Sequence, residues 1–477
     1  MSGQVEAVYQ RCINPACGKT WGVGQTVTAC PACGELLDVV YDWDRQPVPK
    51  SLAEFERKYA SRRDPLHFSG VWRFRELLNF AQERHILSIG EGQTLLRNEP
   101  VVSRYAGLPE AAVFLQYEGL NPSGSFKDNG MTAAFAHARM VGARHAACAS
   151  TGNTSASLAA FAAATQALPP EERMVALVFV GSGRIALGKL AQSLDFGART
   201  VQIPGRFDDA MRRVQEVSRQ LGIYIVNSVN PFRLEGQKTI MFRILEGLRW
   251  EVPDWIVCPG GNLGNSSAFG KAFHELKELG LIRRLPRLAV VNASGADTLD
   301  RLYNDKRLRW NGGRMDRQAV GQYYGQLDAA GRQANTIATA IEINRPVNLS
   351  KCLRALEWLN GVVLSVSDQE ILDAKAIVGR TGLGCEPASA AGVAGLKQLV
   401  ARQVVGKDQR VVCVITGHQL KAPDVTVGYH SEKGDELAKQ LERYGVVDAP
   451  FANRPVQVKN DLDEILRLVR DECERTR

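Results

Sequence analysis

The chain has 477 residues, 45% of them hydrophobic and 23% charged, which is enough for two or three domains with cores of their own. It has no apolar run of about eighteen residues and no basic-then-apolar N-terminal segment, so neither a membrane span nor a signal peptide is predicted. The formal net charge of +8 is spread along the chain, which favours small anionic ligands over nucleic acid. Ten cysteines without a signal peptide indicate reduced thiols and a cytoplasmic location.

Four of the cysteines form two close pairs near the N-terminus, Cys12 with Cys17 and Cys30 with Cys33, and a glycine follows each pair. Four thiolates at about 2.3 Å from the metal satisfy tetrahedral zinc. The spacing predicts a zinc-ribbon-like segment over residues 1–45, structural because a site closed by four thiolates has no open position. Two disulfides or a metal-free ribbon are the alternatives.

Residues 41–49 are interpreted as a linker and residues 52–59 as a short helix, and a catalytic region follows over residues 46–430. Apolar runs then alternate with segments of helical length. The predicted strands are residues 111–115, 146–149, 175–180, 200–203, 223–226, 255–258, 287–291 and 411–415. This alternation predicts an α/β fold with mostly parallel sheets, in which ligands bind at the carboxyl ends of the strands.

Lys127 lies where a turn of Asn, Pro, Ser and Gly residues enters a predicted helix over residues 129–141. Ser125 is predicted to cap that helix, with Asp128 in its first turn. The positive end of the helix dipole and burial would both lower the pKa of the lysine. A lysine that forms an imine needs this, because only the neutral amine attacks an aldehyde. A solvated lysine at a helix start is the alternative.

Two further loops follow predicted strands and open helices. Residues 150–155, Ser-Thr-Gly-Asn-Thr-Ser, can bind a carboxylate through hydroxyls and amides, although simple helix capping is an alternative. Residues 259–265, Pro-Gly-Gly-Asn-Leu-Gly-Asn, can turn successive amides toward one anion, which predicts a phosphate site. Residues 296–333 break the alternation as a surface insertion or lid, and residues 431–477 form a charged C-terminal tail.

The stretch Asn-Pro-Ser-Gly-Ser-Phe-Lys-Asp-x-Gly-Met at residues 121–131 resembles the lysine motif of the threonine synthases, a family of fold-type II pyridoxal-phosphate (PLP) enzymes. Residues 91–95, 227–239, 335–341 and 416–421 resemble further blocks of that family in the same order. A subset of the family also carries an N-terminal cysteine-rich ribbon. The chain departs from the family pattern at Gln93, Leu95, Asn129, Glu342, Asn344, Gln419 and Ala422.

The resemblance implies a tryptophan synthase β-like fold of two α/β domains, with a mobile small domain over about residues 130–230. It implies PLP on Lys127, with the cofactor-binding residues Asn153 at the 3'-oxygen, Thr416 at the pyridine nitrogen, and Gly261, Asn262, Leu263, Gly264 and Asn265 at the phosphate. It assigns the substrate carboxylate to Ser150, Thr151 and Thr154, and the substrate phosphate to Arg184 and Lys189. The expected metal is structural Zn²⁺ on Cys12, Cys17, Cys30 and Cys33.

The implied reaction converts O-phosphohomoserine and water to L-threonine and phosphate, in a homodimer that needs neither nucleic acid nor membrane. A threonine or serine dehydratase shares the fold and the lysine, but it needs no site for a substrate phosphate. A related β- or γ-replacement enzyme differs only in its acceptor. A zinc-ribbon binding protein on an inactive PLP scaffold is an alternative of another class.

Overall fold

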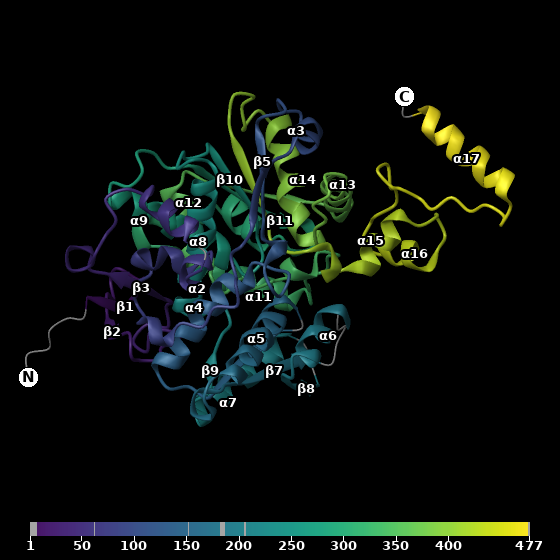
Figure 1. The fold of residues 1–477 in the computed structure, drawn as a ribbon. Coiled ribbons are helices and arrows are strands. Elements are labelled where there is room, and N and C mark those ends of the chain that lie inside the picture. The colour runs from purple at the N-terminus through teal and green to yellow at the C-terminus, as the bar shows by residue number, and fades with distance from the viewer. Residues whose placement is uncertain (1–6, 62, 151, 182–186, 205–206, 476–477) are drawn as a thin grey trace, which may run out of the picture.

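A six-stranded sheet forms the centre of the molecule (Figure 1). The structure is a computed structural model that describes residues 7–61, 63–150, 152–181, 187–204 and 207–475. The strand order is β12-β11-β10-β13-β5-β4, and every neighbouring pair is parallel except β4 with β5. The strands are β4 (Leu95–Asn98), β5 (Val113–Tyr117), β10 (Trp255–Pro259), β11 (Arg287–Ala293), β12 (Val362–Val366) and β13 (Val411–Ile415).

Helices cover both faces of this sheet because its central strands are apolar on both sides. Along β10, Ile256 and Cys258 pack into one core, while Trp255 and Val257 pack into the other, as the two-residue period of a strand requires. The first core includes α8 (Pro231–Gly247), α9 (Gly264–Glu278) and α12 (Leu349–Trp358). The second includes α3 (Pro100–Ala106), α13 (Asp368–Gly379) and α14 (Pro387–Ala401).

A smaller parallel sheet has the order β8-β7-β6-β9. Its strands are β6 (His145–Ala149), β7 (Val175–Gly181), β8 (Arg199–Ile203) and β9 (Tyr224–Ile225). One face packs on α4 (Lys127–Met140) and α5 (Asn153–Ala164), and the other packs on α7 (Phe207–Leu221). Helix α6 (Leu187–Asp195) lies between β7 and β8 in the chain. The two sheets, one parallel and one parallel except for β4, agree with the predicted α/β class.

The N-terminal segment is a three-stranded antiparallel sheet of order β2-β1-β3, which we call the ribbon. Its strands are β1 (Val8–Cys12), β2 (Thr20–Gly22) and β3 (Leu37–Tyr41). Tyr41, which was assigned to a linker, is instead the buried last residue of β3 and stacks on Trp43. The short helices α1 (Glu54–Ala60) and α2 (Pro65–Phe68) then lead into the catalytic body.

The insertion at residues 296–333 lies against the ribbon. It contains α10 (Thr298–Asp300) and α11 (Arg317–Ala329), which buries Tyr323 and Leu327. Arg317 pairs with the ribbon residue Glu35, and Gly313 packs on Pro15. The insertion therefore helps to hold the ribbon.

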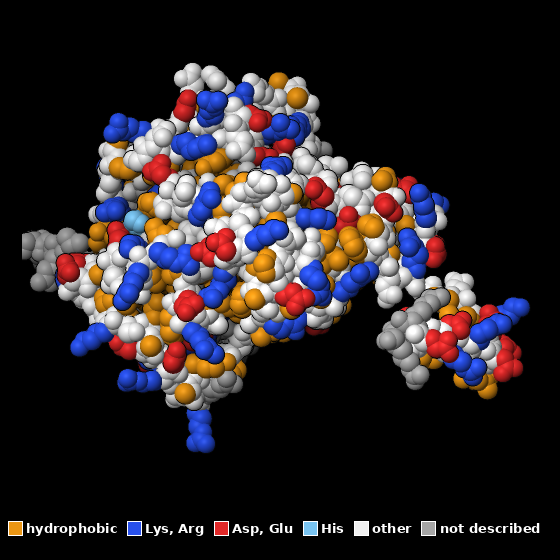
Figure 2. Space-filling view, turned by 90° about the horizontal axis from the view of Figure 1, so that it is seen from above, with side chains coloured by type: hydrophobic (Ala, Val, Ile, Leu, Met, Phe, Trp, Pro, Cys, Tyr) orange, Lys and Arg blue, Asp and Glu red, His pale blue; other side chains and the backbone are white. Residues whose placement is uncertain are grey.

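The C-terminal tail has two parts. Helices α15 (Pro423–His430) and α16 (Glu436–Glu442) stay close to the body, and Leu441 packs into its second core. Helix α17 (Leu462–Arg475) lies apart from the body in Figure 1. On the face shown in Figure 2, basic and acidic side chains are interspersed over the body. No helix in the described ranges combines the length and the apolar character that crossing a bilayer requires.

Candidate active site

Lys127 is the first residue of α4, as its position after a turn predicts. The turn is held by Asp128, which accepts hydrogen bonds from Ser123 N at 2.7 Å and from Ser157 Oγ at 2.6 Å. Burial raises the pKa of Asp128, and these hydrogen bonds oppose the rise. The prediction that Ser125 caps α4 is wrong: Phe126 is the cap residue, and Ser125 instead forms a β-bridge with Gly417.

The lysine turn meets the loop that follows β13. Phe126 N donates to Thr416 O at 2.9 Å, which places Thr416 beside Lys127. The Thr416 hydroxyl lies 2.8 Å from Ser389 Oγ, and Ser389 Oγ also accepts a hydrogen bond from Gly417 N at 3.0 Å. Ser389, in the first turn of α14, therefore fixes the orientation of the Thr416 hydroxyl.

Asn153 begins α5, and its side chain reaches the same helix α14. Its Nδ2 donates to Glu386 Oε1 at 2.8 Å. Its Oδ1 is buried without a hydrogen-bond partner among the described residues. Glu386 N donates to Gly417 O at 3.1 Å, so Glu386 is held against the Thr416 loop. The start of α14 thus holds both residues that were predicted to contact the PLP ring, Asn153 and Thr416.

The loop at residues 150–155 is held in place by Asn227. The Asn227 side chain accepts from Ala149 N at 3.1 Å and donates to Ala149 O at 3.0 Å, directly before the loop. Ser150 Oγ accepts from Gly152 N at 3.1 Å, so part of this residue's role is to shape the turn. Thr151 lies outside the described residues. Gly152 is the cap residue of α5 and no described side chain caps this helix, so the capping alternative is wrong.

Arg233 is a buried cation that lies beside this loop. Its Nη2 donates to Thr154 Oγ1 at 3.3 Å, and its Nη1 donates to Val226 O at 2.7 Å. Burial lowers the pKa of Arg233 to about 10, so the guanidinium stays charged at neutral pH. Within the described part of the chain, no carboxylate lies within 4.0 Å of it. An uncompensated buried charge is costly, which favours an anionic ligand here.

A close crossing of two helices brings Arg233 and Lys127 into one site. A Cβ on Gly236 of α8 would lie 1.9 Å from Asn129 O of α4, and a Cβ on Gly130 would lie 2.7 Å from Arg233 O. Only glycine permits this approach at either position. The crossing sets the first turn of α8 directly beside the first turn of α4.

The predicted phosphate loop, residues 259–265, joins β10 to α9. Leu263 has φ +63°, the left-handed conformation that a loop needs to reverse into a helix. A Cβ on Gly261 would lie 3.0 Å from Ile341 Cα, so a larger residue would collide with the neighbouring segment. The first amides of a helix have no partner within the helix and are available to an anion.

Neighbouring amide side chains secure this loop. Asn348 N donates to Asn262 O at 3.1 Å, and Asn348 Nδ2 donates to Ser228 O at 3.1 Å. Asn265 Oδ1 accepts from Gln237 Nε2 at 2.6 Å. The backbone carbonyl of Asn262 and the side chain of Asn265 therefore fix the loop, and anion binding by its backbone amides stays a prediction.

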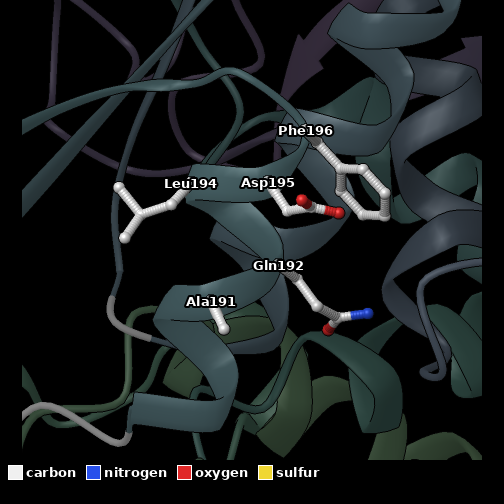
Figure 3. Close-up of a pocket in the computed structure, with 5 residues that line it drawn as sticks. All are labelled: Ala191, Gln192, Leu194, Asp195 and Phe196. Carbon is white, nitrogen blue, oxygen red and sulfur yellow. The ribbon is translucent and has the colours of Figure 1, made fainter.

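The two cations predicted for the substrate phosphate are not placed by the structure. Arg184 lies outside the described residues, and Lys189 is described only as part of the α6 backbone. Another residue of α6, Gln192, donates from Nε2 to Ser123 O at 3.2 Å and accepts from Lys421 Nζ. Gln192 also lines a depression of about 670 Å³ along α6, shown in Figure 3 with its other lining residues Ala191, Leu194, Asp195 and Phe196. Gln192 therefore joins α6 to the lysine turn.

Asn129 occupies a position where the resemblance led us to expect arginine. Its Nδ2 donates to the buried Glu118 Oε2 at 2.6 Å, and Arg243 Nη2 pairs with Glu118 Oε1 at 2.7 Å. Burial would raise the pKa of Glu118, but the Arg243 charge holds it below its ordinary value. Glu118 is thus paired with Arg243 of α8 and hydrogen-bonded to Asn129 of α4.

The four N-terminal cysteines come together as the sequence predicts. All four Sγ atoms lie within 4.8 Å of one another, with Cys12 and Cys33 at 3.4 Å and Cys17 and Cys30 at 3.6 Å. A tetrahedron with metal–sulfur bonds of about 2.3 Å has edges of about 3.8 Å. The four thiols are free cysteines in a geometry that fits one tetrahedral metal.

A lysine at the first residue of a helix, a glycine-rich loop before another helix and the buried Oδ1 of Asn153 fit the cofactor PLP, and the close packing at Gly261 keeps that position of the loop free of a side chain. Residues 87–417 match the family described as "Pyridoxal-phosphate dependent enzyme". The chain is 39% identical to threonine synthase of Methanocaldococcus jannaschii, covering 88% of this chain and 94% of that protein. It is 38% identical to threonine synthase of Methanosarcina acetivorans, covering 88% and 93%. The chain belongs to the threonine synthase family.

Solved structures confirm the fold. The structure of Escherichia coli threonine synthase matches with a TM-score of 0.59 at 17% identity, covering 97% of this chain and all of that one (100%). Threonine deaminase isoform 2 of Solanum lycopersicum matches with a TM-score of 0.54 at 15% identity, covering 84% and 94%. Both enzymes share the fold-type II architecture, so the fold alone does not separate their activities.

Sequence reasoning assigned no role to Arg233, Glu386 or Ser389. Arg233 lies in the block at residues 227–239, whose place after a strand was the available signal. Glu386 precedes Pro387 at the start of α14, a common helix-start pattern, which explains its position without indicating its partner.

Proposed function

We propose that the chain converts O-phosphohomoserine and water to L-threonine and phosphate. The observation that carries the proposal is Arg233, a buried cation without a described carboxylate partner, at the loop proposed to bind the substrate. Because Arg233 donates to Thr154, it would also attract the carboxylate of a dehydratase substrate, so phosphate release is the measurement that separates the two activities. Identity to threonine synthases along most of the chain supports the same conclusion.

PLP is proposed to bind with its aldehyde carbon at Lys127 and its phosphate at the amides of residues 261–265. Asn153 would donate to the 3'-oxygen, and the Thr416 hydroxyl would face the pyridine nitrogen. When bound, PLP supplies the electron sink for the reaction. A neutral hydroxyl at the ring nitrogen, in place of a carboxylate, favours elimination and replacement over transamination.

The protein contributes binding and proton transfer. Ser150, Thr151 and Thr154 are proposed to hold the substrate carboxylate, and the Lys127 amine to move protons at Cα and Cβ. Arg233 is proposed to hold the substrate phosphate, together with Arg184 and Lys189. The phosphate leaves from Cγ, and water adds at Cβ.

The finer parts of the proposal concern the metal and the assembly. The four N-terminal thiolates are proposed to hold structural Zn²⁺, since four thiolates in tetrahedral geometry favour zinc. A homodimer is proposed from the family resemblance, and a cytoplasmic location from the ten cysteines expected to be reduced. If the purified protein shows no visible absorbance from PLP, this would support the alternative of an inactive scaffold.

Phosphate release tests the central proposal. The purified holoenzyme should release one phosphate per threonine formed from O-phosphohomoserine. Production of 2-oxobutanoate from threonine or pyruvate from serine, without phosphate release from O-phosphohomoserine, would establish the dehydratase instead. Incubation with serine as the only substrate is the matched control.

A further inference from the structure

The ribbon docks on the catalytic body through its third strand, β3, beside α4, α8 and α9 (Figure 1). Tyr41 Oη donates to Glu235 Oε2 of α8 at 2.8 Å. Lys271 Nζ of α9 donates to Val39 O, and Lys351 Nζ of α12 donates to Leu37 O, both at 2.6 Å. Alternate residues along β3 therefore contact three different helices.

Buried charges make this interface intolerant of displacement. Asp38 pairs with Lys351 at 3.0 Å and with Arg354 at 2.5 Å. Burial would raise the pKa of Asp38, but Arg354 and Lys351 hold it well below its usual range. Glu235, which is 1% exposed, pairs with Lys238 at 2.6 Å and with Lys271. Moving the ribbon away would leave Lys351 and Arg354 without Asp38 and would take the Tyr41 hydroxyl from Glu235.

The same helices present the active site at their N-terminal ends. Glu235 lies two residues after Arg233 on α8, and Lys351 lies three residues after Asn348, which holds the phosphate loop. Lys271 is on α9, which begins at that loop. The fourth helix, α4, begins at Lys127 and contacts the ribbon through His137, whose Nε2 lies 2.6 Å from Val23 O. The ribbon thus contacts four of the helices that lead to the site, α4, α8, α9 and α12.

We propose that the ribbon is a positioning element of the PLP site, with Asp38 and Tyr41 as positioning residues. Docking of the ribbon sets the relative placement of α4, α8, α9 and α12, and so of the groups that hold PLP. Because metal binding drives the folding of small cysteine ribbons, metal and PLP binding are coupled, and the coupling is reciprocal. This inference rests on the proposed function, since it requires PLP at Lys127.

Two conservative variants of the holoenzyme test the coupling. Tyr41→Phe removes one hydroxyl, and Asp38→Asn removes the counter-charge of Lys351 and Arg354. Both should keep about one zinc per chain by elemental analysis, yet release PLP at least about fivefold faster on dilution, the lower end of usual couplings. The matched control is Ser103→Ala on the remote helix α3, which removes the acceptor of a buried hydrogen bond from Val113 N.

A general loss of stability should lower the thermal midpoint of the control and of the two variants alike, but faster PLP release should be confined to the ribbon variants. Chelation of zinc from the wild type should speed PLP release by a similar factor. In Asp38→Asn, chelation should cause little further increase in the rate of PLP release. If Asp38→Asn does not fold, Tyr41→Phe carries the test. Equal PLP release in wild type, Tyr41→Phe and chelated enzyme would overturn the coupling. A wild type without visible PLP absorbance would overturn the proposed function itself.

Discussion

Asn153 and Glu386 are 233 residues apart in the chain and meet through a hydrogen bond of 2.8 Å from Nδ2 to Oε1. Glu386 is 1% exposed, so this contact is made away from water. It fixes one amide hydrogen of Asn153 and leaves the second for a ligand. The orientation of the proposed contact to the PLP 3'-oxygen is therefore set by a residue on another helix.

Replacing Glu386 should weaken PLP binding through Asn153. Glu386→Ala should lower PLP affinity about five- to tenfold, because a lost hydrogen bond costs about 1–1.5 kcal/mol. PLP titration of the apoenzyme, followed by visible absorbance, measures the effect. The double variant with Asn153→Ala should bind no more weakly than Asn153→Ala alone, since both changes remove the same contact. Losses that simply add would show that Glu386 acts elsewhere.

Lys127→Ala should abolish turnover and the visible absorbance of bound PLP while leaving the fold intact. The reason is that Lys127 is the only group proposed to bond the aldehyde carbon. Circular dichroism checks the fold, and Lys439→Ala on α16 is the control for loss of a lysine. Turnover near the wild-type rate in Lys127→Ala would contradict the central assignment.

Arg233→Gln should lower kcat/KM for O-phosphohomoserine by about one to two orders of magnitude, since a charged hydrogen bond contributes about 1.5–3 kcal/mol. Any turnover of serine or threonine, which carry no phosphate, should fall by a smaller factor. The exposed residue Arg213 provides the control variant Arg213→Gln. The same comparison in Lys189→Ala tests the cation predicted from the sequence. A loss in Lys189→Ala but not in Arg233→Gln would move the phosphate site to α6.

Elemental analysis of the wild type and of cysteine variants should show that the ribbon holds a metal ion. The reduced wild type should contain about one zinc per chain, and Cys30→Ser/Cys33→Ser should contain none. Elemental analysis measures both, with the buried Cys148→Ser as the control for loss of a thiol. A wild type free of metal would contradict the zinc proposal without affecting the PLP proposal.

Glu91 should make stability fall as pH rises through the slightly acidic range. Burial raises its pKa from 4.5 to about 7, while Ser69 Oγ and Ile89 N donate to its carboxylate. Between pH 4.5 and about 7 the folded chain binds a proton that the unfolded chain does not. The free energy of unfolding therefore falls by roughly 1.4 kcal/mol for each pH unit in this range, and this contribution is constant above about pH 7. Thermal midpoints from pH 4.5 to 8 should fall less steeply in Glu91→Gln. The exposed Glu110→Gln should follow the wild type, and parallel curves for all three proteins would refute the assignment.

Local sequence patterns predicted the features that depend on neighbouring residues, namely the buried strands and the start of the helix at Lys127. The strands at residues 255–258 and 411–415 were placed to within one residue, because unbroken apolar runs mark strands buried on both faces. Lys127 was placed at a helix start because turn residues precede it. Ser125 was misassigned as a cap because its bridge partner, Gly417, lies in a loop almost 300 residues later. The contacts of Arg233 and Glu386 likewise join distant segments, and such contacts cannot be predicted from neighbouring residues alone.

The ribbon precedes the catalytic body in the chain, but the surface on which it docks forms only when helices from later in the chain have packed together. His137, Glu235, Lys271 and Lys351 come from four helices spread over more than 200 residues, and the ribbon can bury its charges only after these helices have packed. Interactions that form after the rate-limiting step of folding act on the unfolding rate. The ribbon should therefore slow unfolding of the enzyme and leave its folding rate unchanged, because it docks on a body that has already folded.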